Sequence, residues 1–195
     1  TGFSNSLVGK LSGSALTDAD YNVAMGQQSL AQDTQGSTAV AIGSFALGTQ
    51  NFTTATNNYN VGVGYAAGSA ITTGLRNTLI GSLAGDALTD ADSNVAIGYL
   101  ALSGDTLGSR SVAIGDGALP VQNFTTATNA YNVAVGMFAG DQVTTGTQNT
   151  LIGGEAGDAI QTGSSNTLIG YNAGGLTTGT LNSFLGRSSG SAMTS

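Results

Sequence analysis

Bulky aliphatic residues return at a fixed interval along the whole chain, each followed at once by glycine. The interval is 17 residues, lengthened to 21 at two places and shortened to 16 at the last one. The eleven glycines are Gly9, Gly26, Gly43, Gly64, Gly81, Gly98, Gly115, Gly136, Gly153, Gly170 and Gly186. Short β-branched runs bounded by Gly, Asn and Thr are typical of strands and not of helices. The pattern therefore predicts one short strand per unit, for example at 95–97 and 112–114.

The two 21-residue units lie 72 residues apart, so the chain is about two and a half copies of a four-unit super-repeat. ALTDAD at 15–20 recurs at 87–92, and QNFTTATN at 50–57 recurs at 122–129. Units this short cannot fold alone, but they can stack as the coils of a solenoid. We therefore expect one continuous all-β domain over 1–195, a parallel β-solenoid of about eleven 17-residue coils, two of them of 21. The chain opens in mid-repeat without an initiator Met, so we expect it to be an excerpt of a longer fibre.

Asparagine and glycine each occupy a fixed column of the repeat. Asn stands four residues before the glycine in nine of the eleven units, and Ala39 and Ser111 are the exceptions. Asparagines in register suit a ladder of side-chain amides that hydrogen-bond along a stack. The glycine suits a corner that requires positive φ or the close approach of two backbones.

Side-chain size is correlated at two positions of the unit, one two residues before the glycine and one four residues after it: where one is large, the other is small. Leu79 accompanies Gly85, whereas Ala96 accompanies Leu102. The first kind of unit also has Leu7 with Gly13, Leu151 with Gly157, Leu168 with Gly174 and Phe184 with Gly190; the second has Ala24 with Leu30, Ala41 with Leu47 and Ala113 with Leu119. Close-packed interiors conserve volume in this way, so we expect both positions to fill one slot.

The polarity of the residue seven after the glycine also differs between these two kinds of unit. It is polar where the slot residue after the glycine is Leu: Asp33, Gln50, Asp105 and Gln122. It is apolar in most other units: Leu16, Ile71, Leu88, Val143, Ile160 and Met193. Two units are small at both slot positions, Gly62 with Gly68 and Ala134 with Gly140, and there Ile71 and Val143 are expected to fill the space. We interpret these combinations as interchangeable packing solutions for one coil.

Side chains alternate on a strand, so Val95 and Ile97 point one way and Ala96 points the other. Both faces of the strand are therefore apolar or small, and we expect both to be covered. A thin coil can cover only one face with its own return strand. The other face most simply packs against a second chain, which predicts a homo-oligomer.

Composition excludes several classes of function. Charged residues make up 8% of the chain, and its formal net charge is −7. Such a chain disfavours nucleic acid, whose phosphates need basic partners, and no apolar run reaches the ~20 residues that cross a bilayer, so we expect no membrane insertion in this segment. Without His or Cys there is no Ser-His or Cys-His nucleophile and no usual zinc site. We therefore expect no enzyme and no cofactor; an acidic pair such as Asp86 with Asp158, acting as a glycosidase across subunits, is the remaining enzymatic alternative.

The repeat itself resembles a known family. NVAIGYLA at 94–101 and SVAIGDGA at 111–118 are similar to the head repeats of trimeric autotransporter adhesins of the YadA type and to related repeats in phage tail fibres. The resemblance covers essentially the whole chain. It implies a left-handed parallel β-roll, three chains about one axis, and an adhesive role at a bacterial surface or on a virion. With about 4.8 Å per coil, eleven coils would form a rod on the order of 50 Å long.

The two long units offer candidate ligand-binding residues. These are Asn51, Phe52, Thr53 and Tyr59 in the first unit and Asn123, Phe124, Thr125 and Tyr131 in the second. Protruding loops with aromatic faces and amides would suit a glycan. Alternatively, a duplication has preserved both loops, and the aromatic rings simply plug the coil.

Two other polar patterns have both a functional and a structural interpretation. Alternating acids make Asp18, Asp20, Asp90 and Asp92 weak calcium candidates, although turn capping explains them as well. A threonine column, eight residues after the glycine, resembles the flat faces of ice-binding solenoids: Thr17, Thr34, Thr72, Thr89, Thr106 and Thr144. The column is interrupted at Asn51, Asn123 and Gln161, and threonine is common in solenoid turns.

Together these features predict a structural and adhesive extracellular fibre segment, carried on a cell surface or a phage tail. Its receptor would be a cell-surface glycan or protein. The alternative is a ligand-binding solenoid that recognises polysaccharide or ice through repeated Thr, Asn and aromatic faces. A tailspike that degrades polysaccharide is a third hypothesis.

Overall fold

The computed structural model describes residues 2–191, and the regular structure of these residues consists of strands without a helix. Met193, one of the apolar residues noted above, lies outside this range. The strands are β1 (Ser6–Val8), β2 (Val23–Met25), β3 (Gly36–Ser37), β4 (Val40–Ile42), β5 (Thr56–Asn57), β6 (Val61–Val63), β7 (Thr78–Ile80), β8 (Val95–Ile97), β9 (Gly108–Ser109), β10 (Val112–Ile114), β11 (Thr128–Asn129), β12 (Val133–Val135), β13 (Thr150–Ile152), β14 (Thr167–Ile169) and β15 (Ser183–Leu185).

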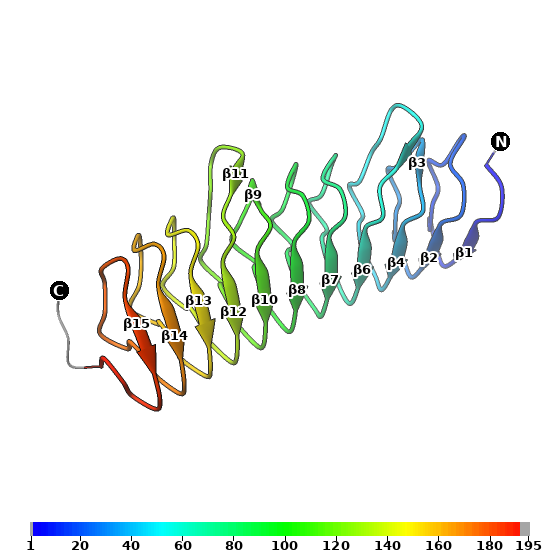
Figure 1. Ribbon diagram of the computed structural model, residues 1–195. Helices are drawn as coiled ribbons and strands as arrows, with labels where there is room; N and C mark the ends of the chain where they lie inside the picture. The colour runs from blue at the N-terminus through cyan, green and yellow to red at the C-terminus, as the bar shows by residue number, and fades with distance from the viewer. Residues whose placement is uncertain (1, 192–195) are drawn as a thin grey trace.

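Eleven three-residue strands form one parallel sheet, which we call the main sheet. Its order is β1, β2, β4, β6, β7, β8, β10, β12, β13, β14, β15, so each strand pairs with the strand of the next repeat. Equivalent residues lie opposite each other, as Ala96 does Ala113. The chain is thus a parallel β-solenoid with one coil per repeat, as predicted, and Figure 1 shows the coils stacked into a rod.

The return leg of each coil differs from the expected strand. It consists mainly of turns, whose N–H groups bond to neighbouring coils: Leu30 N–H donates to the carbonyl of Ala46 at 3.1 Å, and Thr17 N–H to that of Thr34 at 2.9 Å. Short strands are added to the return legs only where each long coil pairs with the 17-residue coil before it, β3 with β5 and β9 with β11, within residues 2–191. β5 and β11 belong to the long coils. These coils project beyond the others in Figure 1.

Buried asparagines join each coil to the next. The Oδ1 of Asn77 accepts the N–H of Asn94 at 2.9 Å, and its Nδ2 donates to the carbonyl of Ala91 at 2.7 Å. Both bonds recur at Asn22, Asn60, Asn94, Asn132, Asn149 and Asn166. Each asparagine amide therefore donates a hydrogen bond within its own coil and accepts one from a backbone N–H of the following coil, which confirms the predicted ladder.

The shared slot is confirmed in the coils where a large residue precedes the glycine. A Cβ placed on Gly85 would lie 2.8 Å from Cδ2 of the fully buried Leu79, closer than real Cβ contacts allow. The same collision would occur at Gly13, Gly157, Gly174 and Gly190, with Leu7, Leu151, Leu168 and Phe184 respectively. The side chain before the glycine thus occupies the volume that the residue after it leaves free.

The coils that are small at both positions are filled differently from the prediction. A Cβ on Gly68 would lie 2.6 Å from Leu79 and 2.9 Å from Leu47, which belong to the coils on either side, and 3.1 Å from Ile71. Gly140 has the same surroundings, made by Leu119, Leu151 and Val143. Leucines of the neighbouring coils therefore fill this space together with the residue seven after the glycine.

The strands of the main sheet have one buried and one outward face. Ala96 is fully buried, while Val95 and Ile97 are partly exposed. The outward side chains form two columns along the sheet: the last residue of each strand is aliphatic, whereas the first is Val in six strands and Ser or Thr in the other five. In the aliphatic column, Val8, Met25, Ile42 and Ile80 are more than one third exposed. The predicted orientation is confirmed, and the chain itself does not fully cover this face.

Candidate functional site

The two long coils are anchored by buried carboxylates. Asp33 Oδ1 accepts the N–H groups of Gly36 and Phe52, each at 2.9 Å, and its Oδ2 accepts Nε2 of Gln50 at 2.6 Å. Gln50 Oε1 in turn accepts Nδ2 of Asn60 at 2.9 Å. Asp33, Gln50 and Asn60 are fully buried. A single carboxylate thus holds the start of β3 and the beginning of the projecting loop, and the amides tie it to the asparagine ladder.

Asp105, in the coil before the second long coil, repeats this arrangement. Its Oδ1 accepts the N–H groups of Gly108 and Phe124, each at 3.0 Å, and Gln122 Nε2 donates to its Oδ2. Gln122 also donates to Ser111 Oγ at 3.0 Å. The sequence showed only that the residues seven after these glycines are polar. Their position immediately before each 21-residue unit was the signal that could have identified them as loop anchors.

Burial raises the pKa of the Asp105 carboxyl above its ordinary value of 3.8, although hydrogen bonds from Gln122, Phe124 and Gly108 oppose the shift. The folded chain therefore takes up this proton at a higher pH than the unfolded chain does. As the pH falls from neutral towards 3.8, this group increases the free energy of unfolding. At neutral pH the buried charge makes the fold less stable than it is when the carboxyl is protonated.

We expect Asp105→Asn to remove this gain in stability on acidification, because asparagine does not titrate. The measurement is urea unfolding at a series of pH values between neutral and 3.8, with the slope of stability against pH compared between wild type and variant. The other acidic groups contribute to both proteins and cancel. A wild-type stability that falls relative to the variant over this range would contradict the role assigned to Asp105.

The predicted ligand-binding residues lie in the two long units, but the rings of Phe52 and Phe124 do not form an open surface. Phe52 and Phe124 are each 6% exposed, so their rings fill the base of the loop and cannot stack on a ligand. Asn51 and Asn123 accept the hydroxyls of Thr34 and Thr106, each at 3.1 Å. Thr53, Thr125, Tyr59 and Tyr131 are exposed. The structure thus assigns the two phenylalanines the plugging role that was the alternative interpretation.

The calcium candidates bond to neighbouring coils. Asp20 Oδ1 accepts Phe3 N–H at 2.6 Å, and Asp92 Oδ1 accepts Leu75 N–H at 2.8 Å. Asp90 accepts the Thr73 hydroxyl at 2.7 Å, and Asp18 occupies the equivalent position of the earlier copy. Between residues 2 and 191, no three acidic side chains converge as ligands of one cation would. The arrangement favours the turn and interlayer role of these carboxylates.

The threonine column also bonds between coils. Thr17 donates its hydroxyl to the carbonyl of Thr34 at 3.0 Å, and Thr89 to that of Thr106 at 3.1 Å. Thr144 donates likewise to Gln161 at 3.1 Å. These hydroxyls stabilise the stack, which explains why threonine recurs at this position.

The acidic pair considered for catalysis is separated along the rod. Asp86 and Asp158 lie four coils apart, about 20 Å at 4.8 Å per coil, which exceeds the spacing of glycosidase carboxylates. Burial raises the pKa of both carboxyls, and the charge of Glu155 adds to the shift at Asp158. They occupy equivalent turns and do not form one site within a chain.

The chain has no match among protein-family models, curated protein sequences or solved structures. None of the residues described here forms a helix long and apolar enough to span a membrane. The fold and its interior hydrogen-bond networks define a parallel β-solenoid.

Proposed function

We propose that this chain is a structural and adhesive segment of an extracellular fibre, in which three copies associate through the outward face of the main sheet. One observation carries the proposal. All six tyrosines and all four basic residues of the chain lie either two residues before or two residues after a strand of the main sheet. The aliphatic column between them, formed by the last residue of each strand, is partly exposed.

We call the positions two residues before the strands of the main sheet its leading edge, and the positions two residues after the strands its trailing edge. The leading edge holds Tyr21, Tyr59, Arg76, Arg110 and Tyr131, and the trailing edge holds Lys10, Tyr65, Tyr99, Tyr171 and Arg187. The guanidinium of Arg110 lies 5.6 Å from the ring centroid of Tyr131, and that of Arg187 lies 5.8 Å from that of Tyr171. An apolar centre with tyrosine and arginine at its border is the composition of protein–protein interfaces.

The size and symmetry of this face also support self-association. The main sheet is about 50 Å long, and with both edges it is about seven residues wide, so its area is on the order of 1,000 Å². That exceeds the ~800 Å² per partner of a standard interface. In a three-fold arrangement about an axis along the rod, the leading edge of one copy meets the trailing edge of the next. At β10 this would bring Arg110 towards Asp116 of the partner subunit, so the charges are complementary.

The trimeric state and the extracellular role follow from the resemblance to adhesin-head and tail-fibre repeats. A rigid stack of coils, joined by asparagine amides and without long unpaired segments in its interior, suits a shaft or head that projects from a surface. We place the fibre on a cell surface or a virion tail. Its adhesive ligand would be a glycan or protein on the surface of another cell.

We expect the wild-type chain to sediment with about three times its mass of 19.1 kDa. The double variant Ile97→Glu with Ile114→Glu places two charges in the outward face of β8 and β10, and an unpaired buried charge costs about 3–5 kcal/mol. Association should therefore weaken by at least a hundredfold, with a shift to monomer in sedimentation velocity. Circular dichroism should remain that of the wild type, because these side chains do not reach the interior.

The matched control is Val121→Glu with Leu176→Glu, which adds the same charges at exposed apolar positions away from the main sheet. This control should keep the wild-type mass. A wild-type chain that is monomeric at micromolar concentration would refute the proposal, as would equal masses for the two double variants.

A further inference from the structure

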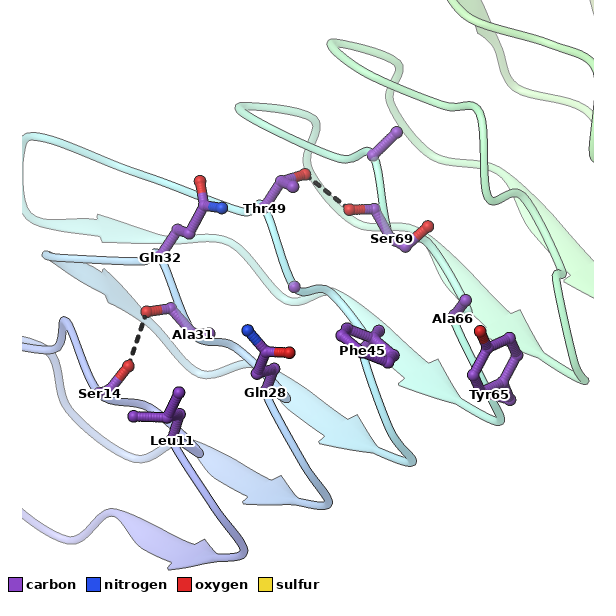
Figure 2. Close-up of a pocket in the computed structure, with 12 residues that line it drawn as sticks. Leu11, Ser14, Gln28, Ala31, Gln32, Phe45, Thr49, Tyr65, Ala66 and Ser69 are labelled. Atoms are coloured by element: carbon purple, nitrogen blue, oxygen red, sulfur yellow. Dashed lines mark hydrogen bonds between the residues drawn. The ribbon is translucent and has the colours of Figure 1, made fainter.

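An open groove of about 760 Å³ crosses the first four coils, beyond the ends of β1, β2, β4 and β6. Figure 2 shows Leu11, Gln28, Phe45 and Tyr65 in one row on the side next to the strands. A second row, farther from the strands, includes Gln32 and Thr49. The chain connects the rows through small residues such as Ala31 and Gly48, which leave the space open.

The groove is uncharged, although the chain is acidic. None of the residues that line it carries a charge. Its floor and near wall present aromatic rings: Phe45 and Tyr65 meet edge to face, with centroids 6.0 Å apart, and both remain at least one third exposed. The amide of Gln28 lies beside Phe45 in Figure 2. Exposed rings next to amides and hydroxyls combine apolar contact with hydrogen bonding in one concave surface.

This surface belongs to the first copy of the super-repeat alone. The long loops and the ALTDAD segments are identical in the two copies, yet eleven of the twelve residues that line the groove are replaced 72 residues later. Phe45 corresponds to Gly117, and Ala66 to Phe138. Ser14 and Ser69 correspond to Asp86 and Asp141, which make the second copy of this face acidic. The repeat therefore keeps its long loops and ALTDAD segments, while the chemistry of this face changes almost entirely.

We propose that the groove binds a neutral polysaccharide that runs along the stack. The faces of Phe45 and Tyr65 would pack against the C–H faces of pyranose rings, while the amides of Gln28 and Gln32 bond to hydroxyls. Coils rise by about 4.8 Å, close to the length that one hexose adds to an extended chain, so successive coils can meet successive sugars. The net charge of −7 repels polyanions, and a lining without acids does not attract polycations.

This inference deepens the adhesive part of the proposed function, because it names the class of ligand and its place. The groove lies beside the main sheet and not on its outward face, and only Tyr65 belongs to both the groove and the trailing edge.

The test is native electrophoresis of the full chain through gels that contain dextran, laminarin, galactomannan or mannan, with alginate and polygalacturonate as acidic comparisons. We expect at least one neutral polysaccharide to retard the wild type and neither acidic one to do so. Phe45→Gly and Gln28→Leu should each weaken the retardation at least tenfold. Both variants carry the residue of the second copy, where Gly117 and Leu100 have φ of 57° and 54°, against 63° and 55° at Phe45 and Gln28. The fold can therefore accept them.

The matched control is Phe138→Ala, which removes an exposed ring from the same face outside the groove and installs the residue that the first copy has as Ala66. It should bind like the wild type. Lack of retardation by every neutral polysaccharide would overturn the inference, as would stronger retardation by an acidic one or undiminished binding by Phe45→Gly. Sedimentation of the same variants separates this result from a failure of self-association, because none of the three changes lies on the outward face of the main sheet.

Discussion

Gly153→Ala is expected to lower the free energy of unfolding by about 4 kcal/mol, while Gly154→Ala, one residue further on, leaves it nearly unchanged. Gly153 has φ of 130°, which costs a residue with a Cβ about 1–3 kcal/mol. A Cβ there would also lie 2.5 Å from the carbonyl oxygen of Gly170 in the next coil. Gly153 and Gly170 directly follow the paired strands β13 and β14, and Gly170 N–H donates to the carbonyl of Ile152 at 2.7 Å, so neither glycine can move without breaking bonds between coils.

Gly154 provides the matched control at the adjacent position. A Cβ on Gly154 would make an ordinary contact, 3.5 Å from the ring of Tyr171, and its φ is not in the left-handed region. Urea unfolding should separate the two variants, and the melting temperature of Gly153→Ala should fall on the order of 10 °C for a chain of this size. Equal stability of the two variants would show that the coils do not stack as closely as described here.

The repeat explains how much of the fold the sequence could predict. Because each coil presents the same environment to the next, a requirement of that environment appears eleven times in the sequence. The glycine at the corner, the asparagine of the ladder and the exchange of Leu79 with Gly85 were recognisable for this reason. The close approach of Gly153 to Gly170 is the physical cause of the glycine column.

Features that depend on contacts between neighbouring coils, or that occur in only one copy of the super-repeat, could not be predicted from the sequence. The space at Gly68 is filled by Leu47 and Leu79, which belong to other units, and a comparison of columns within one unit does not show this. Asp33 bonds to Phe52 N–H, 19 residues away, so its anchoring role required the path of the long loop. The return leg was expected to be a strand, but its polar turns can bond to the next coil without a regular ladder.

The candidate sites could be predicted from the sequence only in part, for the same reason. Both interpretations of Phe52 fitted the sequence, because burial of one ring depends on how the loop closes over it. The groove around Phe45 gave no signal, since its residues break the repeat and do not recur. A binding surface that is specific to one copy is by nature invisible to a search for periodic residues.

Leu79→Ala and Gly85→Leu are expected to destabilise the fold separately and to compensate each other in part when combined. Leu79→Ala empties a fully buried position, which costs about 3 kcal/mol. Gly85→Leu forces a second large side chain into the occupied slot, at a cost of about 2 kcal/mol. The backbone accepts leucine here, because Leu102 has φ of 54° at the equivalent position and Gly85 has 55°.

In the double variant the new leucine occupies the volume that Leu79 leaves, as Leu102 does beside Ala96. Its destabilisation should be at least 2 kcal/mol smaller than the sum of the single effects, measured by urea unfolding as a double-mutant cycle. It should remain less stable than the wild type, since Leu88 lies 2.9 Å from a Cβ on Gly85, whereas the coil of Leu102 has Asp105 at that place. Leu79→Ala with Gly157→Leu, in a coil four repeats away, is the control and should be additive. Additivity in both pairs would mean that the two positions do not share a slot, and the exchange of bulk along the sequence would then have no structural cause in the coil.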